Sequence, residues 1–495
     1  MPSAVRRLFL ALALIALTPA SAFAEWRRAE SPNFIVYSDG SERNLRDYTA
    51  RLERFDALMR VRFGRGTDES IRKLPVYMVE NGGALRTALP KLPEGFTGYY
   101  STSENDIFAI LVRGESDDIL LHEYTHHFMA RTGNGRYPGW LSEGFAEYFA
   151  TATVPERGKA SFGLPNPGRQ YALAQNRWLS MDQVLRARGS MDITDTAGRG
   201  MYYAQSWALT HWALSDPARV QNLVAYLSAI NTGRDPVEAW QAIFGTSPDQ
   251  LAAQLRAYLR TGLRYAQIDL PAVAPTITVS VLSPAADAVL LPMINARVPD
   301  PADVDGPALL QLLRTSSARF PDDPLALVAL GRAEKQWGDE AAAETALGAA
   351  LERQPDNVEA LLLMADILVD RAGMADNAAE DLRQRRLAQG FLQRALDADP
   401  TDYRVYAALA RIRRNSSDYP SENDLRTWIL AVQRAPQVMS IRGDAAIAMM
   451  ERGRYEDAVI LLTPIVNDPH SGPGAQRARA MLERIQQRRD APTQD

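Results

Sequence analysis

In the first half of the chain, short apolar runs alternate with stretches whose apolar residues follow a helical spacing. Segments rich in β-branched and aromatic residues predict strands at 31–38, 74–79, 96–100 and 107–112. A helical spacing predicts a long helix that begins after Ser41 and ends near Phe63. Ser116 is a good N-cap for a later helix, and the chain from there to about Leu263 is predicted to be largely helical. This order of elements predicts a compact α+β domain.

The last third of the chain carries an internal repeat. Pro321 and Pro355 begin similar segments 34 residues apart, which is the tetratricopeptide period. Related boundaries recur at Pro400, Pro436 and Pro469, with about 11 extra residues before the first of these three. The repeated proline spacing favours a tetratricopeptide-like solenoid of paired helices over a generic helical bundle.

Two further segments have no helical pattern. Residues 266–302 are rich in Pro, Ala and Val and predict an irregular or partly extended linker. Residues 488–495 predict a disordered tail. The α+β domain is therefore expected at 25–265 and the helical repeats at 303–487.

Residues 1–24 have the pattern of a bacterial secretory signal. Two arginines precede ten apolar residues, and a small-x-small cleavage site ends at Ala24. Ten apolar residues are short for a bilayer, which needs about 20, so an uncleaved anchor is the less favoured alternative. We expect cleavage after Ala24, a periplasmic or secreted protein, and no stable membrane anchor.

The composition narrows the range of partners. The chain has 46% apolar and 23% charged residues and a formal charge of −5, or −7 without residues 1–24 (53 basic against 60 acidic). No block of like charge stands out, so no nucleic-acid partner is expected. The chain has no cysteine, which excludes disulfides and a cysteine-linked lipid anchor.

The segment H-E-Y-T-H, residues 122–126, is the strongest chemical signal in the sequence. On a helix, His122 and His126 lie one turn apart on one face and can fill two corners of a zinc tetrahedron. Glu123 points to a neighbouring sector, where it can act on a metal-bound water as the general base of a metallopeptidase. The alternative is a polar helix face whose histidines bond only solvent.

A third ligand is expected from a second helix, predicted at 140–150. Catalytic zinc takes three protein ligands and keeps a fourth position open. Glu143 lies 17 residues beyond His126, near the start of this helix, and can reach the two imidazoles if the helices pack together. Glu147, one turn further on, is the candidate acceptor for the second N–H of His122 or His126. Its alternative is a solvated carboxylate.

These residues carry a resemblance to a known group of enzymes. H-E-Y-T-H followed by P-G-W-L-S-E-G-F-A-E-Y-F resembles the gluzincin clan of zinc metallopeptidases, in particular aminopeptidase N-type enzymes and bacterial peptidase MA-like proteins. The resemblance covers about residues 96–215 and implies a zincin-like fold with one Zn²⁺ ion. It implies His122, His126 and Glu143 as ligands and Glu123 as general base. It also implies that Tyr203, in the segment Y-Y-A-Q-S-W-A-L, stabilises the oxyanion.

The sequence departs from aminopeptidase N-type enzymes in two places. The loop between the H-E-x-x-H segment and the third ligand is two residues shorter, and no G-x-M-E-N strand precedes the segment. In those enzymes that strand binds the free amine of the substrate. An endopeptidase is therefore expected rather than an aminopeptidase.

The sequence thus predicts an α+β zincin-like metallopeptidase domain followed by an all-α tetratricopeptide-like solenoid. The expected function is hydrolysis of peptide or protein substrates by an exported zinc enzyme. The alternative is a non-catalytic periplasmic scaffold with a structural or retired zinc site. Solenoids offer extended surfaces to proteins, so a protein partner on the repeats is expected under either interpretation.

Overall fold

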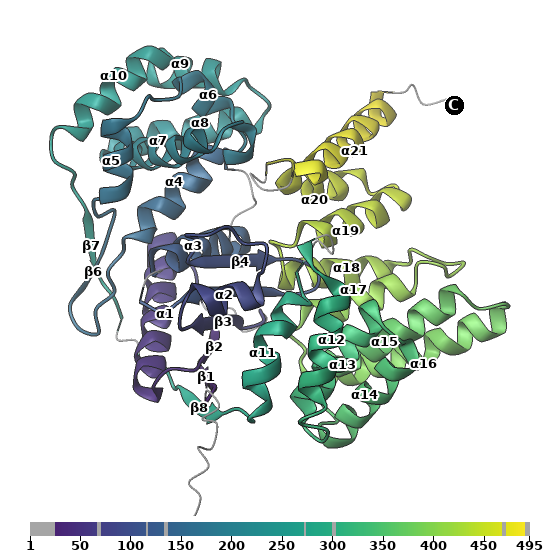
Figure 1. Ribbon diagram of the computed structural model, residues 1–495. Helices are drawn as coiled ribbons and strands as arrows, with labels where there is room; N and C mark the ends of the chain where they lie inside the picture. Colours follow the sequence, from purple (N-terminus) through teal and green to yellow (C-terminus); the bar gives the residue numbers. More distant parts are fainter. Residues whose placement is uncertain are drawn as a thin grey trace, which may run out of the picture.

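The structure is a computed structural model in which residues 25–66, 71–114, 117–132, 137–271, 274–298, 303–467 and 472–490 are described. The predicted secretory signal and Ser116 lie outside these residues. Figure 1 shows a mixed sheet with its covering helices, a second group of helices above it, and a stack of helices along one side. None of the described helices is long and apolar enough to cross a membrane.

A six-stranded mixed sheet forms the centre of the N-terminal part. Its strand order is β4-β5-β3-β2-β1-β8, with β2, β3 and β5 parallel and the other pairs antiparallel. Its strands are β1 (Arg27–Glu30), β2 (Phe34–Ser38), β3 (Leu74–Val79), β4 (Gly98–Thr102), β5 (Ile107–Val112) and β8 (Thr278–Val281). Both central strands, β3 and β5, are buried along their whole length, as strands covered on two faces are. The edges of the sheet are β4 and β8.

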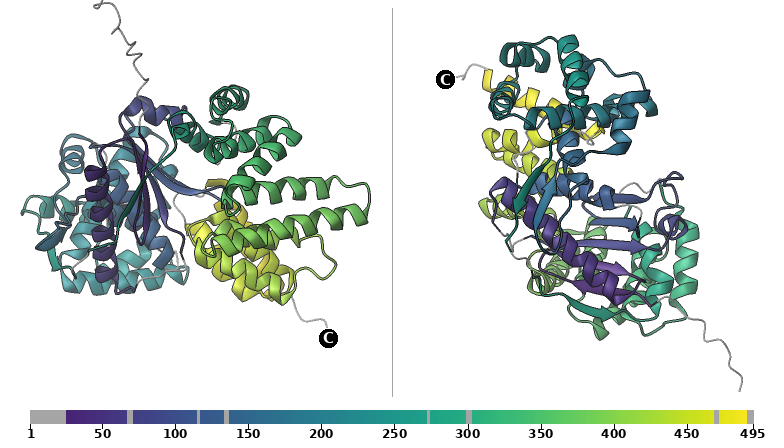
Figure 2. Two further views of the ribbon diagram at one scale, coloured as in Figure 1. Left: turned by 90° about the horizontal axis from the view of Figure 1, so that it is seen from below. Right: turned by 90° about the vertical axis from the view of Figure 1, so that its left-hand side faces the viewer.

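Helices cover both faces of this sheet. One face packs against α1 (Glu42–Phe63) and α3 (Asp117–Thr132) through side chains such as Val36, Val76 and Leu111. The opposite face, with Tyr77, Phe108 and the alternate residues of the same strands, packs against α2 (Gly82–Ala88) and α11 (Ala285–Asn295). The first repeat helices share this second core. The two views in Figure 2 show the sheet between its helical layers.

A second group of helices lies above the sheet in Figure 1, next to α3. It contains α4 (Gly139–Ala150), α5 (Pro167–Gln175), α6 (Met181–Arg186), the short helix η1 (Ser190–Asp192), α7 (Thr196–Leu214), α8 (Pro217–Asn231), α9 (Pro236–Phe244) and α10 (Pro248–Leu259). A two-stranded antiparallel ribbon of β6 (Lys159–Phe162) and β7 (Ala266–Asp269) flanks it. The predicted helical character up to about Leu263 is confirmed, and β6 is an addition to it.

The linker prediction is correct in part: the segment is partly extended, but it also contains a helix and packs on the sheet. Within residues 266–302 the structure has β7, which pairs with β6, β8, which extends the sheet beside β1, and α11, which packs on the sheet. Most apolar residues of α11 are buried by these contacts, with Val289 and Ile294 fully inaccessible. The sequence lacks a clear rhythm there because each element is short and its partners lie far away in the chain.

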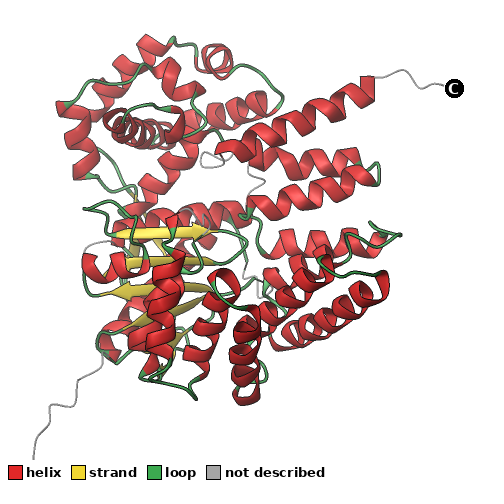
Figure 3. Cartoon of the chain, turned by 45° about the vertical axis from the view of Figure 1, so that its right-hand side comes forward, coloured by secondary structure: helices red, strands yellow, loops and turns green. Residues whose placement is uncertain are grey.

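The last third consists of stacked helix pairs, as Figure 3 shows. The helices are α12 (Gly306–Ser317), α13 (Pro324–Trp337), α14 (Glu340–Arg353), α15 (Val358–Gly373), α16 (Ala378–Ala398), α17 (Tyr403–Ile412), α18 (Glu422–Arg434), α19 (Met439–Glu451), α20 (Tyr455–Asn467) and α21 (Gly472–Asp490). The starts of α13 and α15 are 34 residues apart, in agreement with the predicted period. The extra residues lengthen α15 and α16 to 16 and 21 residues. Residues 488–490 belong to α21 and so not to a disordered tail, and the remaining residues of the predicted tail, 491–495, lie outside the described residues.

Candidate metal centre

Helix α3 presents the two histidines of the H-E-x-x-H segment on one side. Its other side is apolar, and Leu121, Tyr124 and Phe128 are buried against the sheet and α1. The side chains of His122 and His126 are each 14% exposed, so they lie in a recess and stay accessible. The predicted helix over this segment is confirmed.

Helix α4 brings Glu143 to these histidines. The helix is buried at nearly every position, because it passes between α3 and α7. Glu143 is fully inaccessible and faces the imidazoles. Gly144 faces the other way, toward α7, where a Cβ atom would lie only 2.5 Å from the carbonyl oxygen of Ser206. The small residue therefore brings α4 close to α7.

We expect the substitution Gly144→Ala to destabilise the fold by about 1–3 kcal/mol, because the added methyl group forces α4 away from a backbone atom of α7. The matched control is Gly348→Ala in α14, where nothing lies within 4 Å of the added methyl. That variant should gain stability, by up to about 1 kcal/mol. Thermal unfolding of both variants measures the difference, and equal midpoints would contradict the close packing of α4 on α7.

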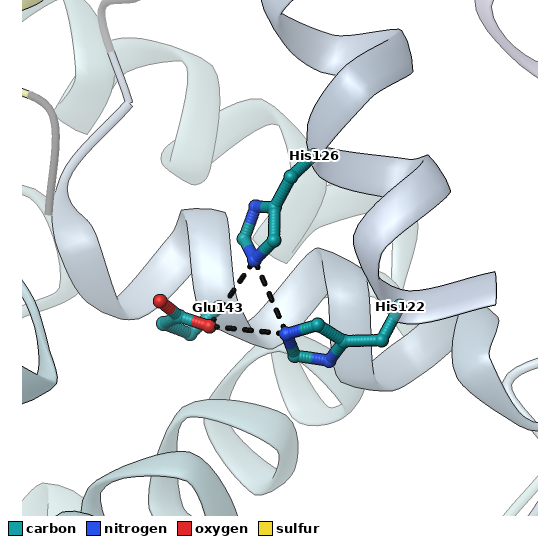
Figure 4. A group of neighbouring side chains, drawn as sticks. All are labelled: His122, His126 and Glu143. Carbon is teal, nitrogen blue, oxygen red and sulfur yellow. Dashed lines mark hydrogen bonds and ion pairs between the residues drawn. The ribbon is translucent and has the colours of Figure 1, made fainter. Parts of the chain in front are cut away.

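Three ligand atoms from α3 and α4 meet at one point, as Figure 4 shows. The distances are 3.2 Å between the two Nε2 atoms, 3.3 Å from His126 Nε2 to Glu143 Oε2, and 3.4 Å from His122 Nε2 to the same oxygen. A tetrahedral zinc ion with bonds of about 2.0–2.1 Å has ligands about 3.3–3.4 Å apart. The three donors therefore already have the spacing of one triangular face of a zinc site.

The electrostatics of this cluster favour a cation. Burial lowers the pKa of His122, but hydrogen bonds to Glu143 and Glu147 outweigh it and raise this pKa to about 10. A group of carboxylates that holds a proton on an imidazole also attracts a metal dication to the same place. Nitrogen and carboxylate donors in this number suit zinc. The residues present therefore fit the metal that the resemblance implies.

Glu147 lies behind His122, at the place where the sequence analysis expects it. Its Oε1 atom is 3.3 Å from Nδ1 of His122, so the ring nitrogen that faces away from the cluster has a carboxylate acceptor. Burial raises the pKa of Glu147, but His122 and Arg169 outweigh this effect and lower it to about 2. Glu147 is therefore ionised at neutral pH. Its role in metal binding stays a prediction.

Arg169, which the sequence pattern does not reveal as a site residue, holds Glu147 in place. Its Nε and Nη2 atoms donate to the two carboxylate oxygens at 2.8 and 2.6 Å, a bidentate pair. Asn166 caps α5 and also donates to Glu147 at 3.3 Å. The Asn-Pro start of α5 is readable from the sequence, but the pairing of α5 with α4 is not. Ser142, whose Oγ is 3.4 Å from Nδ1 of His126, is a second missed neighbour.

Tyr203 lies on α7 beside the cluster. Its ring meets that of His122 edge-on, with 6.1 Å between the ring centroids, and its hydroxyl lies 3.1 Å from Ser190 Oγ. The guanidinium carbon of Arg169 is 5.2 Å from the centre of the same ring. Burial raises the pKa of Tyr203, and Glu143 adds to this shift, so the phenol keeps its proton.

Glu123 occupies the side of α3 that faces β4. Ile119, Glu123 and His127 are four residues apart and lie on one face of the helix. Ile119 packs so closely on Gly98 that a Cβ atom there would lie 2.9 Å away. Nδ1 of His127 is 2.7 Å from the hydroxyl of Tyr100. Glu123 is half-buried between these two contacts. The strand beside it is the edge strand β4, whereas β5 is an interior strand of the sheet.

The other described histidines belong to packing contacts. His127 is buried, and burial lowers its pKa well below the usual value, so its ring is neutral. His211 is also buried, with Nδ1 2.7 Å from the Tyr258 hydroxyl and Nε2 3.0 Å from the Gly163 carbonyl oxygen. His470 lies outside the described residues. Among the described residues, the cluster of His122, His126 and Glu143 is the one group with this metal-binding spacing.

Comparisons with known proteins describe two parts of the chain. Residues 118–238, which include the cluster and Tyr203, match a family model described as "Protein of unknown function (DUF1570)". No curated protein matches the sequence. Parts of the structure resemble a thermophilic TPR protein of Thermus thermophilus, TTC0263, at 16% identity, with 37% of this chain and 91% of that chain covered and a TM-score of 0.31. They also resemble the MamA RS-1 ArsTM double mutant at 17% identity, with 38% and 88% covered and a TM-score of 0.26.

Proposed function

We propose that this protein is an exported zinc-dependent peptidase that cleaves within peptide chains. The observation that carries the proposal is the triangle of donor atoms, whose sides of 3.2–3.4 Å match a tetrahedral zinc face. His122, His126 and Glu143 would hold the ion. When bound, zinc supplies a Lewis acid that polarises a carbonyl group and lowers the pKa of water.

Glu123 is the proposed general base. It stands on the face of α3 next to the metal ligands and opposite β4, so it lies between the cluster and the edge of the sheet. Its carboxylate takes a proton from the attacking water and passes it to the leaving amine. The charge of Glu123 also contributes to raising the pKa of Tyr99 and Tyr100 on β4, after the larger effect of their burial.

Two further features support hydrolysis of a peptide bond. The Tyr203 hydroxyl, which keeps its proton, is a donor beside the cluster and suits an oxyanion that develops there. The edge strand β4 has one side without a neighbouring strand among the described residues, so an extended peptide can add to it through main-chain hydrogen bonds. Backbone pairing of this kind holds a peptide in the middle of its length, which favours an endopeptidase.

The second candidate function is a scaffold that binds another protein. The stacked helix pairs of the last third favour it, since repeat proteins of this architecture present extended binding surfaces. A zinc site in a mere scaffold would be closed by four protein ligands. Among the described residues only three such groups come together, and a carboxylate stands beside them. On this ground we favour the enzyme.

The proposal is tested by metal analysis combined with a library of quenched fluorescent peptides. We expect one zinc per purified chain, cleavage at internal peptide bonds, loss of cleavage after chelation, and recovery when zinc is returned. A chain that holds zinc and cleaves no member of the library would instead support the scaffold.

A further inference from the structure

The repeat helices form hydrogen bonds and an ion pair with the turn that joins β4 to β5. The hydroxyl of Tyr403, at the start of α17, donates to the carbonyl oxygen of Ser103 at 2.7 Å. Nη1 of Arg404 donates to the carbonyl oxygen of Asn105 at 3.3 Å. Arg411, two turns further along α17, forms an ion pair with Glu104. Three consecutive turn residues therefore have partners on one repeat helix about 300 residues away in sequence.

The fourth turn residue, Asp106, enters a buried network of charges. Its two oxygens accept hydrogen bonds from Arg72 at 2.6 Å and from Arg297 at 3.0 Å. Burial raises the pKa of Asp106, but the two arginines outweigh this effect and lower it, so the carboxylate stays charged. Arg297 also pairs with Glu359 of α15, and that carboxylate pairs with Arg404. The network thus joins the residues just before β3 and just after α11 to two repeat helices at the end of the β4–β5 turn.

A second contact reaches the helix that carries the metal ligands. The side-chain amide of Gln437, between α18 and α19, lies 3.3 Å from Nδ1 of His127. The same ring nitrogen is 2.7 Å from the hydroxyl of Tyr100 on β4. A repeat residue, a residue of α3 and a residue of β4 therefore meet at one buried atom. The repeats therefore contact α3 through His127 and the β4–β5 turn through Tyr403, so they reach both elements that border Glu123.

We propose that the repeat region is an intramolecular clamp that positions the edge strand β4 against the Glu123 face of α3, with Tyr403 as a positioning residue. The surface of α17 that carries Tyr403, Arg404 and Arg411 therefore binds the chain's own β4–β5 turn. The consequence for peptide binding rests on the proposed function, because a peptide that adds to β4 must lie between this strand and the metal ligands. The contacts between the repeats and the β4–β5 turn do not depend on whether the protein is a peptidase.

The test compares Tyr403→Phe with Tyr406→Phe in the full-length chain. Both tyrosines belong to α17 and both donate to a backbone carbonyl oxygen, but Tyr406 bonds Pro400 within the repeats, at 3.0 Å. Loss of one such hydrogen bond corresponds to about a three- to tenfold change in an opening equilibrium. We expect amide hydrogen exchange of β4, residues 98–102, to accelerate by this factor in Tyr403→Phe and to stay unchanged in Tyr406→Phe. Equal exchange of β4 in the two variants would overturn the clamp.

Two further measurements distinguish a failure of the clamp from a failure of the proposed function. The variant Glu104→Gln removes an exposed partner of Arg411 and leaves the core untouched, so its β4 amides should also exchange faster, by about twofold. In kinetics with a long peptide, Tyr403→Phe should raise KM about three- to tenfold with kcat within twofold and zinc content unchanged. Faster β4 exchange in a chain without any peptidase activity would refute the proposed function and leave the clamp in place. A change in thermal stability alone, with unchanged β4 exchange and KM, would show a merely structural contact.

Discussion

Replacing Glu123 with glutamine should lower kcat/KM for peptide hydrolysis by about 10²–10⁴-fold and leave zinc binding unchanged. The amide has the same shape as the carboxylate, but it cannot accept the proton of the attacking water. The three donors of the cluster do not include Glu123, so the metal should remain at one ion per chain. Steady-state cleavage of a peptide from the library, with zinc measured on the same sample, gives both quantities.

The control for this experiment is Glu94→Gln. Glu94 is an exposed residue between α2 and β4, so the same chemical change there should leave activity and zinc content at the wild-type level. If Glu123→Gln cleaves peptides as fast as the wild type, the assigned base is wrong. If it loses zinc as well as activity, Glu123 takes part in holding the metal, which contradicts the division of roles between it and Glu143.

Replacing Glu143 with glutamine should weaken zinc binding by more than about 100-fold. Glu143 is fully buried, and it is the one carboxylate among the three donors. Its loss leaves two neutral imidazoles and an amide, which is a poor donor for zinc compared with an anion. Competition with a chelator of known affinity measures the change, and activity should fall in parallel at limiting zinc.

Glu147→Gln is the matched comparison, one turn along the same helix. Glu147 contacts His122 through Nδ1 and not through the nitrogen of the cluster, so it should affect zinc affinity only by about 10–100-fold. Losses of equal size in the two variants would contradict the assignment of Glu143 as a direct ligand and Glu147 as a partner of His122. An unchanged affinity in Glu143→Gln would exclude the proposed site.

Local signals allowed α1 and β5 to be predicted with their observed bounds, whereas β1 and α2 were not predicted and β4 begins two residues later than expected. Ser41 caps α1 by accepting from the amide of Asn44, and α1 ends at Phe63 before Gly64, whose positive φ closes the helix. The strand at 107–112 has the predicted bounds, because β5 is an uninterrupted apolar run. Signals of this kind depend on residues close together in the chain.

Long-range contacts account for what the sequence could not reveal. The segment 266–302 contains β8 and α11, whose places depend on β1 and on the second face of the sheet. Arg169 was missed because its partner, Glu147, lies 22 residues away on another helix. The H-E-x-x-H segment did predict the two histidines, since their spacing alone puts them on one helix face. Glu143 reaches the histidines because α4 packs between α3 and α7, and this packing depends on long-range contacts.

A crystal structure of the zinc-loaded protein, with anomalous scattering at the zinc edge, tests the central claim most directly. We predict one anomalous peak bonded to His122 Nε2, His126 Nε2 and a Glu143 oxygen at about 2.0–2.2 Å, with the fourth position held by solvent. A peak elsewhere in the chain, or a fourth protein side chain on the ion, would contradict it.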